Sequence, residues 1–219
     1  MTASIEYRET IAVLTLGADE NRFSPDWLAQ VNQLLDEIES NAQALITIGD
    51  GKFYSNGLDL DWLLANGDRA DWYVDQVHAL FARILTFGIP TVAAINGHAF
   101  GAGAMVAIAH DFRVMRADRG FYCFPEADIN IPFTPGMAAL IQNKLTPQHA
   151  VEAMTTGRRY GGPDAVAAGI AERAVDEASL VDAAIERVTP ILGKDKGTVG
   201  AIKSVMFTSV TDALRAGRR

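Results

Sequence analysis

Two glycine-rich segments of this sequence combine residue types that can bind an anion through backbone N–H groups. They are residues 56–58 (sequence NGL) and residues 101–103 (sequence GAG). Each precedes a stretch that we expect to be helical, and a helix start carries unpaired N–H groups and the positive end of the helix dipole. If the two turns meet, one N–H from each would form an oxyanion hole that stabilises negative charge on a carbonyl oxygen. The same glycines also fit simple close packing.

The residue pattern around the second turn predicts a strand, a turn and a helix. Residues 91–95 form a short apolar run rich in β-branched side chains, which is typical of a strand covered on both faces. Residues 104–109 are small and apolar, as expected for a buried helix. The glycines between them would therefore open a helix inside the protein.

The rest of the chain alternates between strand and helix patterns, which predicts an α/β fold. We expect strands at 5–9, 11–16, 44–48, 112–115, 120–124 and near 174–175, and helices at about 25–40, 69–87, after 134, after 146 and over 163–168. We expect an irregular loop at 125–132 and, from about 177 onward, two helical segments separated near Gly193. The predicted organisation is one structural unit, with a core of residues 1–190 and a C-terminal helical segment of residues 191–219.

Composition limits the classes of function that the chain can have. Its 219 residues, 49% of them apolar, suit one domain with a sizeable core. No apolar run approaches the roughly 18 residues of a membrane span and the start lacks a signal-peptide pattern, so we expect no membrane partner and a cytoplasmic location. A net charge of −8 without a basic stripe argues against nucleic acid as a partner. The single cysteine and the spacing of the four histidines suggest no metal site.

Four segments of the sequence together resemble one known family. They are residues 53–60 (FYSNGLDL), 90–111, 124–129 (FPEADI) and 165–170 (AVAAGI), and their order and spacing are similar to the crotonase (enoyl-CoA hydratase/isomerase) superfamily over roughly residues 3–190. The resemblance implies a ββα spiral core with a C-terminal helical extension, a homotrimer or hexamer, and an acyl-CoA thioester as substrate with no separate cofactor. By position, it implies that Leu58 and Ala102 supply the oxyanion N–H groups. The implied substrate pocket contains Ser55, Asn56, Gly57, Gly101 and Met105.

A departure from the family pattern points to one activity within it. Hydratases of the family carry two glutamates, and this chain has Met105 at the first position and Glu126 at the second. A single base can still move a proton from C2 to C4 of a 3-enoyl thioester. The sequence therefore resembles the Δ3,Δ2-enoyl-CoA isomerases, and residues 55–57 and 119–121 are similar to peroxisomal plant-type members. An apolar pocket is expected to raise the pKa of Glu126 and make it a stronger base.

Two alternatives stay open at this point. One is an enoyl-CoA hydratase, or another acyl-CoA thioester enzyme of the superfamily, that takes its missing acid from a residue such as Asp128, although a helix cap or a surface charge also fits Asp128. The other is a non-catalytic acyl-CoA binding protein. Cys123 is expected to be a buried, inert thiol because no basic neighbour is evident. Arg158 and Arg159 fit either a phosphate contact or an exposed helix end.

Overall fold

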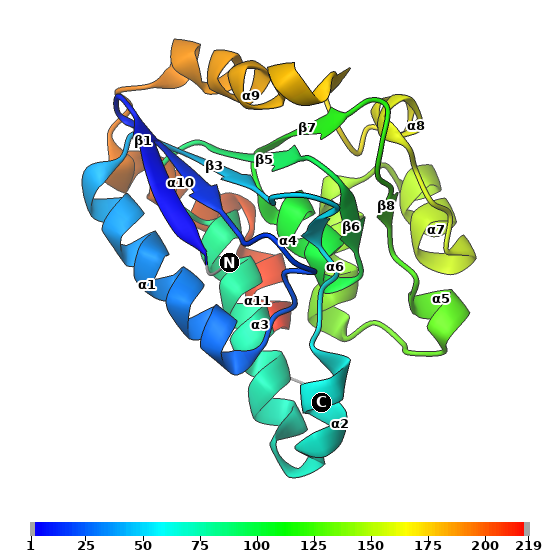
Figure 1. Ribbon diagram of the computed structural model, residues 1–219. Helices are drawn as coiled ribbons and strands as arrows, with labels where there is room; N and C mark the ends of the chain where they lie inside the picture. The colour runs from blue at the N-terminus through cyan, green and yellow to red at the C-terminus, as the bar shows by residue number, and fades with distance from the viewer. Residues whose placement is uncertain (1–2, 217–219) are drawn as a thin grey trace.

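A six-stranded sheet lies at the centre of the fold (Figure 1). The computed structural model describes residues 3–216. The strands are β1 (Ser4–Arg8), β2 (Ile11–Thr15), β3 (Ala44–Ile48), β5 (Thr91–Ile95), β7 (Phe112–Arg116) and β9 (Arg173–Val175), and they pair in that order. Strands β1 and β2 pair antiparallel, and the other neighbouring pairs of this sheet are parallel. The loops that follow the parallel strands therefore lie at the same edge of the sheet, where their carboxyl ends meet.

A second, smaller sheet lies beyond the carboxyl ends of the central strands. Its three parallel strands are β4 (Phe53–Ser55), β6 (His98–Phe100) and β8 (Tyr122–Cys123). Each follows a long strand directly along the chain: β4 follows β3, β6 follows β5, and β8 follows β7. A helix follows each short strand, so the chain repeats a strand, strand, helix unit. This repeat brings the segments after β4, β6 and β8 to the same region of the molecule.

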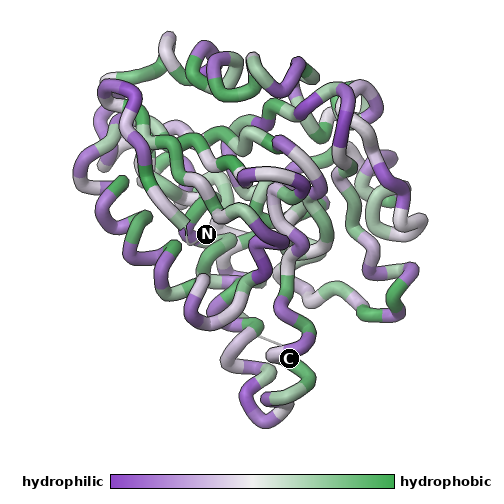
Figure 2. The backbone as a smooth tube through the Cα atoms, in the orientation of Figure 1, coloured by the Kyte–Doolittle hydropathy of each residue, from purple (hydrophilic) through white to green (hydrophobic). Residues whose placement is uncertain are grey.

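Helices cover both faces of the large sheet. On one face lie α1 (Pro25–Asn41), α3 (Ala70–Leu85) and the wholly buried α4 (Ala102–Ala109), with α6 (Pro135–Lys144) packed on α4. On the other face, α9 (Leu180–Val188) packs on β3, β5 and β7. Figure 2 shows apolar and polar residues alternating along α1, as expected for a helix with one face on the core. The remaining helices are α2 (Leu60–Ala65), α5 (Glu126–Ile129), α7 (Pro147–Thr156), α8 (Gly162–Ala167), α10 (Lys196–Met206) and α11 (Thr208–Arg215).

Local sequence explains where several of these helices begin. Ser24, Thr134 and Thr146 each precede a proline and accept a hydrogen bond from the backbone N–H three residues on, which caps α1, α6 and α7. Asp59 caps α2 in the same way, by accepting from the N–H of Trp62. These helices, and the strands of the large sheet, lie where the sequence predicted them.

Three features differ from the sequence-based expectations. The short strands β4 and β6 are not among the strands expected from the sequence, and β8 is shorter than the strand expected at 120–124. The expected loop at 125–132 contains the one-turn helix α5, because the N–H groups of Asp128 and Ile129 both reach the carbonyl of Pro125. The chain from 177 forms three α-helices instead of two, because the backbone of Phe207 leaves the helical conformation between α10 and α11 (φ −109°, ψ 18°). Beyond that break, α11 packs on α3 and α6, within the main body of the protein.

Candidate active site

The two glycine-rich turns meet, which the sequence could not show. Gly57 has φ +80°, and a Cβ on it would lie 2.8 Å from the nitrogen of Ala102 and 2.8 Å from the carbonyl oxygen of Phe100. A Cβ on Gly103 would overlap the carbonyl of Ser55. Only residues without a side chain allow the turn after β4 and the start of α4 to approach this closely. The glycines therefore permit close packing, and this packing is what brings the two turns together.

The backbone N–H groups of Leu58 and Ala102 are available for a ligand. Neighbouring N–H groups are occupied: that of Gly57 donates to Ser55 Oγ, and that of Gly101 donates to the carbonyl of Cys123. Within residues 3–216, no hydrogen bond uses the N–H of Leu58 or of Ala102. Two unpaired donors from adjacent turns are the parts that an oxyanion hole requires.

Glu126 places a carboxyl group beside these donors. It is the first residue of α5 and only 8% exposed, and a Cβ on Gly101 would lie 3.4 Å from its Oε1 atom, so its carboxyl lies against the turn that leads to Ala102. Its Oε2 atom is buried without a hydrogen-bond partner among the described residues. Burial raises the pKa of Glu126 from its usual value of 4.5 to about 7. Near neutral pH, such a group can both accept and release a proton.

These groups share one cavity of about 220 Å³ with mainly apolar walls. Its lining residues are Arg22, Asn56, Leu58, Leu60, Phe100, Gly101, Ala102, Pro125, Glu126, Ile129 and Ile131. Glu126 is the one carboxylate in this lining. A second cavity of about 620 Å³ shares Glu126 and Ile131 with the first, so the two are neighbours across the residues around α5.

The other residues implied by the family resemblance lie behind this lining or outside it. Ser55 and Gly57 are buried in the turn, and Met105 is 1% exposed and belongs to the core around α4, not to the cavity lining. Asp128 is exposed and lies against Gly157, where an added Cβ would collide with its carboxylate. Asp128 is therefore not part of the lining on which Glu126 lies.

The remaining candidates from the sequence have structural surroundings. Cys123 is buried and donates to the carbonyl of Gly157, and burial raises the pKa of its thiol to about 11, as expected of an inert cysteine. Arg158 forms an ion pair with Glu152. Arg159 lies 5.7 Å from the ring centre of Phe100, close to the cavity. No group of three or more His, Cys, Asp or Glu side chains in the described chain could hold a metal ion.

Two residues near the cavity were missed by the sequence analysis. Arg22 lines the cavity and forms ion pairs with Glu20 and Asp61. Asn21 is buried next to the turn after β4, and its backbone is left-handed with φ +50°. The sequence carries only a weak signal for either one, because both belong to an irregular segment between β2 and α1.

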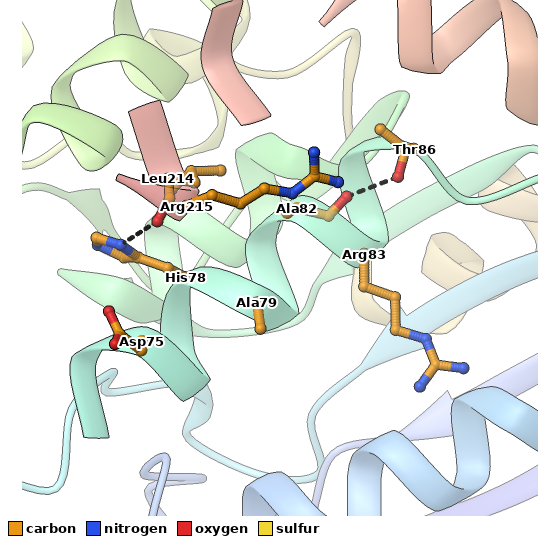
Figure 3. Close-up of a pocket in the computed structure, with 8 residues that line it drawn as sticks. All are labelled: Asp75, His78, Ala79, Ala82, Arg83, Thr86, Leu214 and Arg215. Atoms are coloured by element: carbon orange, nitrogen blue, oxygen red, sulfur yellow. Dashed lines mark hydrogen bonds between the residues drawn. The ribbon is translucent and has the colours of Figure 1, made fainter. Parts of the chain in front are cut away.

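Another cavity, larger than the one around Leu58 and Ala102, lies elsewhere in the protein, and none of the site residues predicted from the sequence lines it. It measures about 470 Å³ and lies between α3 and α11 (Figure 3). Figure 3 shows His78 of α3 bonded to the carbonyl of Leu214, and the same imidazole also bonds to Thr134 Oγ1 at the start of α6. These bonds fasten α11 to the body of the protein, so we assign His78 a structural role.

Comparison with known proteins identifies the family. Residues 6–219 match the family model described as enoyl-CoA hydratase/isomerase. The chain is 38% identical over 185 residues to enoyl-CoA delta isomerase 3 of Arabidopsis thaliana, covering 80% of this chain and 78% of that protein. It is 33% identical over 167 residues to carnitinyl-CoA dehydratase of Escherichia coli (strain K12), covering 76% and 63%. The chain belongs to the enoyl-CoA hydratase/isomerase family, as its sequence motifs predicted.

Solved structures confirm the fold. A probable enoyl-CoA hydratase of Mycobacterium tuberculosis superimposes with a TM-score of 0.91 at 24% identity, covering 99% of this chain and 93% of that one. Human mitochondrial delta3-delta2-enoyl-CoA isomerase superimposes with a TM-score of 0.90 at 21% identity, covering 99% and 87%. The crotonase-like α/β spiral expected from the sequence is therefore confirmed. Among residues 3–216, no helix has the length and apolarity needed to cross a membrane.

Proposed function

We propose that this protein is a Δ3,Δ2-enoyl-CoA isomerase that acts on an acyl-CoA substrate. The observation that carries the proposal is the presence of a single buried carboxylate, Glu126, beside the two unpaired N–H groups of Leu58 and Ala102. The curated relatives named enoyl-CoA delta isomerases, at 32% to 38% identity, support this choice within the family.

The geometry supports a mechanism with one base. The N–H groups of Leu58 and Ala102 donate to the thioester oxygen, and ionised Glu126 removes a proton from C2 of the 3-enoyl group. The electron pair of the C2–H bond then forms a dienolate whose negative charge lies on that oxygen. When Glu126 returns the proton, the electron pair of the C3–C4 double bond binds it at C4. The carbonyl then re-forms, and the C1–C2 double bond of the dienolate becomes a new double bond between C2 and C3. The mainly apolar cavity walls favour this transfer because burial makes the Glu126 carboxylate a stronger base.

The hydratase alternative lacks support in the cavity. Addition of water benefits from a second acid, and the helix position that carries it in hydratases is the thioether Met105. Asp128, the substitute considered from the sequence, is exposed and faces Gly157 outside the cavity lining. A non-catalytic binding protein would have no need to bury the Glu126 carboxyl, whose Oε2 atom has no partner among the described residues, beside two backbone donors.

A homotrimer or hexamer belongs to the same proposal. Three large apolar side chains of α10, Ile202, Val205 and Met206, are 54% to 78% exposed. Two of them, Ile202 and Met206, line a groove of about 450 Å³. An exposed apolar cluster of this kind is typical of a protein–protein interface. We expect light scattering to give an oligomer for the wild type and a smaller species for Val205→Glu. The expected absence of a separate cofactor and the cytoplasmic location stay predictions.

The test of the proposed reaction is a comparison of Glu126→Ala with Asp128→Ala in an isomerisation assay with 3-hexenoyl-CoA. We expect Glu126→Ala to lose turnover while it still binds 2-hexenoyl-CoA, as measured by calorimetry. Asp128→Ala is the matched control on the same short helix, and it should keep most of the activity. Turnover retained by Glu126→Ala would remove Glu126 as the proton shuttle, and loss in Asp128→Ala alone would move that role to Asp128.

A further inference from the structure

The irregular segment of residues 19–23 holds the turn that presents the Leu58 N–H group. At its centre, Asn21 is 1% exposed and has φ +50°. This left-handed conformation is uncommon for residues with a side chain, and asparagine tolerates it better than most. A buried asparagine in this conformation therefore indicates that its side chain has a specific task.

Asn21 is bonded to the residues that lead into the turn. Its side-chain amide donates to the carbonyls of Phe53 at 3.3 Å and Tyr54 at 3.1 Å, both in β4. Its own carbonyl accepts from Ser55 Oγ at 2.8 Å, and Ser55 Oγ in turn accepts from the N–H of Gly57 at 3.1 Å. This chain of bonds ends one residue before Leu58.

The neighbours of Asn21 hold the same turn from either side. The N–H of Phe23 donates to the carbonyl of Gly57 at 2.8 Å, and the N–H of Asn56 donates to the carbonyl of Glu20 at 2.8 Å. The carbonyl of Gly57 is part of the peptide unit that contains the Leu58 N–H. Because this peptide unit is planar, fixing its carbonyl also fixes the direction of the N–H.

We propose that Asn21 is a positioning residue for the oxyanion hole: its side-chain amide holds β4, and β4 leads through Ser55 and Gly57 to the peptide unit of Leu58. The inference rests on the proposed function, since it assumes that this N–H binds the thioester oxygen. Oxyanion donors act only within about 2.7 to 3.1 Å of the oxygen, and a misplacement of about 1 Å can cost about 10²-fold in rate. Asn21 thus affects catalysis without touching the substrate.

Asn21→Gly separates the role of the amide from that of the backbone. Glycine keeps the left-handed conformation but removes both side-chain hydrogen bonds. We expect kcat for 3-hexenoyl-CoA to fall about 10- to 100-fold while KM changes much less, because the lost alignment matters most in the transition state. Ser55→Ala removes the two bonds of Ser55 Oγ, one to the carbonyl of Asn21 and one from the N–H of Gly57, and it should lower kcat in the same way. It tests the positioning of the turn even if Asn21→Gly does not fold.

Asn96→Ala is the matched control. Asn96 is also a buried asparagine, 5% exposed, and it also bonds to a turn through its side chain: Oδ1 accepts from the N–H of Gly49 and Nδ2 donates to the carbonyl of Gly51. That turn lies outside the lining of the cavity. Its loss should lower stability and leave kcat within a few-fold of the wild type.

The absorption spectrum of bound 2,4-hexadienoyl-CoA reports on the oxyanion hole directly. Hydrogen bonds to the thioester oxygen polarise the conjugated system, so we expect a red shift on wild-type protein and on Asn96→Ala, and a smaller shift on Asn21→Gly. A full red shift together with wild-type kcat in Asn21→Gly and Ser55→Ala would overturn the positioning role. Wild-type protein that neither shifts this spectrum nor isomerises 3-hexenoyl-CoA would overturn the proposed function, and this inference with it.

Discussion

Replacing Glu126 with glutamine should make the protein more stable at alkaline pH while it removes activity. Burial raises the pKa of the Glu126 carboxyl from 4.5 to about 7 in the folded protein. Below pH 4.5 the carboxyl is protonated in both the folded and unfolded states. Between pH 4.5 and 7 only the unfolded state releases the proton, so the free energy of unfolding falls as pH rises, and it levels off above pH 7. Glutamine is neutral throughout and avoids this loss.

The size of the effect follows from the shift. One pKa unit corresponds to about 1.4 kcal/mol, so glutamine should gain about 3 kcal/mol over glutamate at pH 8.5 and about 1.4 kcal/mol at pH 5.5. Urea unfolding of wild type and Glu126→Gln at the two pH values measures the difference at equal protein concentration. Glu6→Gln is the control for replacing a carboxylate by an amide, because the Glu6 side chain is 65% exposed.

The reasoning would be refuted by a stability difference between Glu126→Gln and wild type that is the same at both pH values. It would also be refuted if the glutamine variant were the less stable protein at pH 8.5. Either result would mean that burial does not disfavour the ionised form of this carboxyl, and the argument for Glu126 as a strengthened base would fail with it.

Three further predictions concern the same region. The kcat/KM of isomerisation should rise with pH to a plateau, with a midpoint near 7 set by ionisation of Glu126, and a rate independent of pH between 5.5 and 8.5 would contradict this. Gly103→Ala should lower kcat about 10²-fold or more, because the new Cβ overlaps the Ser55 carbonyl and separates the two turns. The control Gly197→Ala in α10 introduces only an ordinary contact, so its kcat should be near that of the wild type. Equal kcat values for the two variants would refute the close-packing argument. Cys123 should react with a thiol reagent only after unfolding, since it is buried and its pKa is about 11, and rapid labelling of native protein would disprove its inertness.

Local signals in the sequence were enough for most of the fold. Ser24 followed by Pro25 is a helix start with a physical cause, and β5 is apolar because both of its faces are covered. The short strands β4 and β6 gave no such signal, because three residues are too few to show a period of two. Helix α5 was missed for a similar reason: one turn cannot display helical spacing.

The candidate site needed information that no single segment carries. The glycines at 57 and 103 indicated tight turns, but their meeting depends on the parallel pairing of β4 with β6, which joins segments more than 40 residues apart. Family resemblance supplied Glu126, and the structure supplied its burial and the raised pKa. The role of Asn21 could not be predicted from the sequence, because its side chain bonds to backbone carbonyls whose positions depend on the folded chain.

The most direct test of the account is a pair of assays on one preparation of the wild-type protein. The first follows conversion of 3-hexenoyl-CoA to 2-hexenoyl-CoA, and the second follows hydration of 2-hexenoyl-CoA. A single buried carboxylate beside two backbone donors predicts isomerisation with hydration slower by orders of magnitude. Hydration at a comparable rate would contradict the one-base mechanism. It would require a second acid in the cavity, and Glu126 is the one carboxylate among the residues that line it.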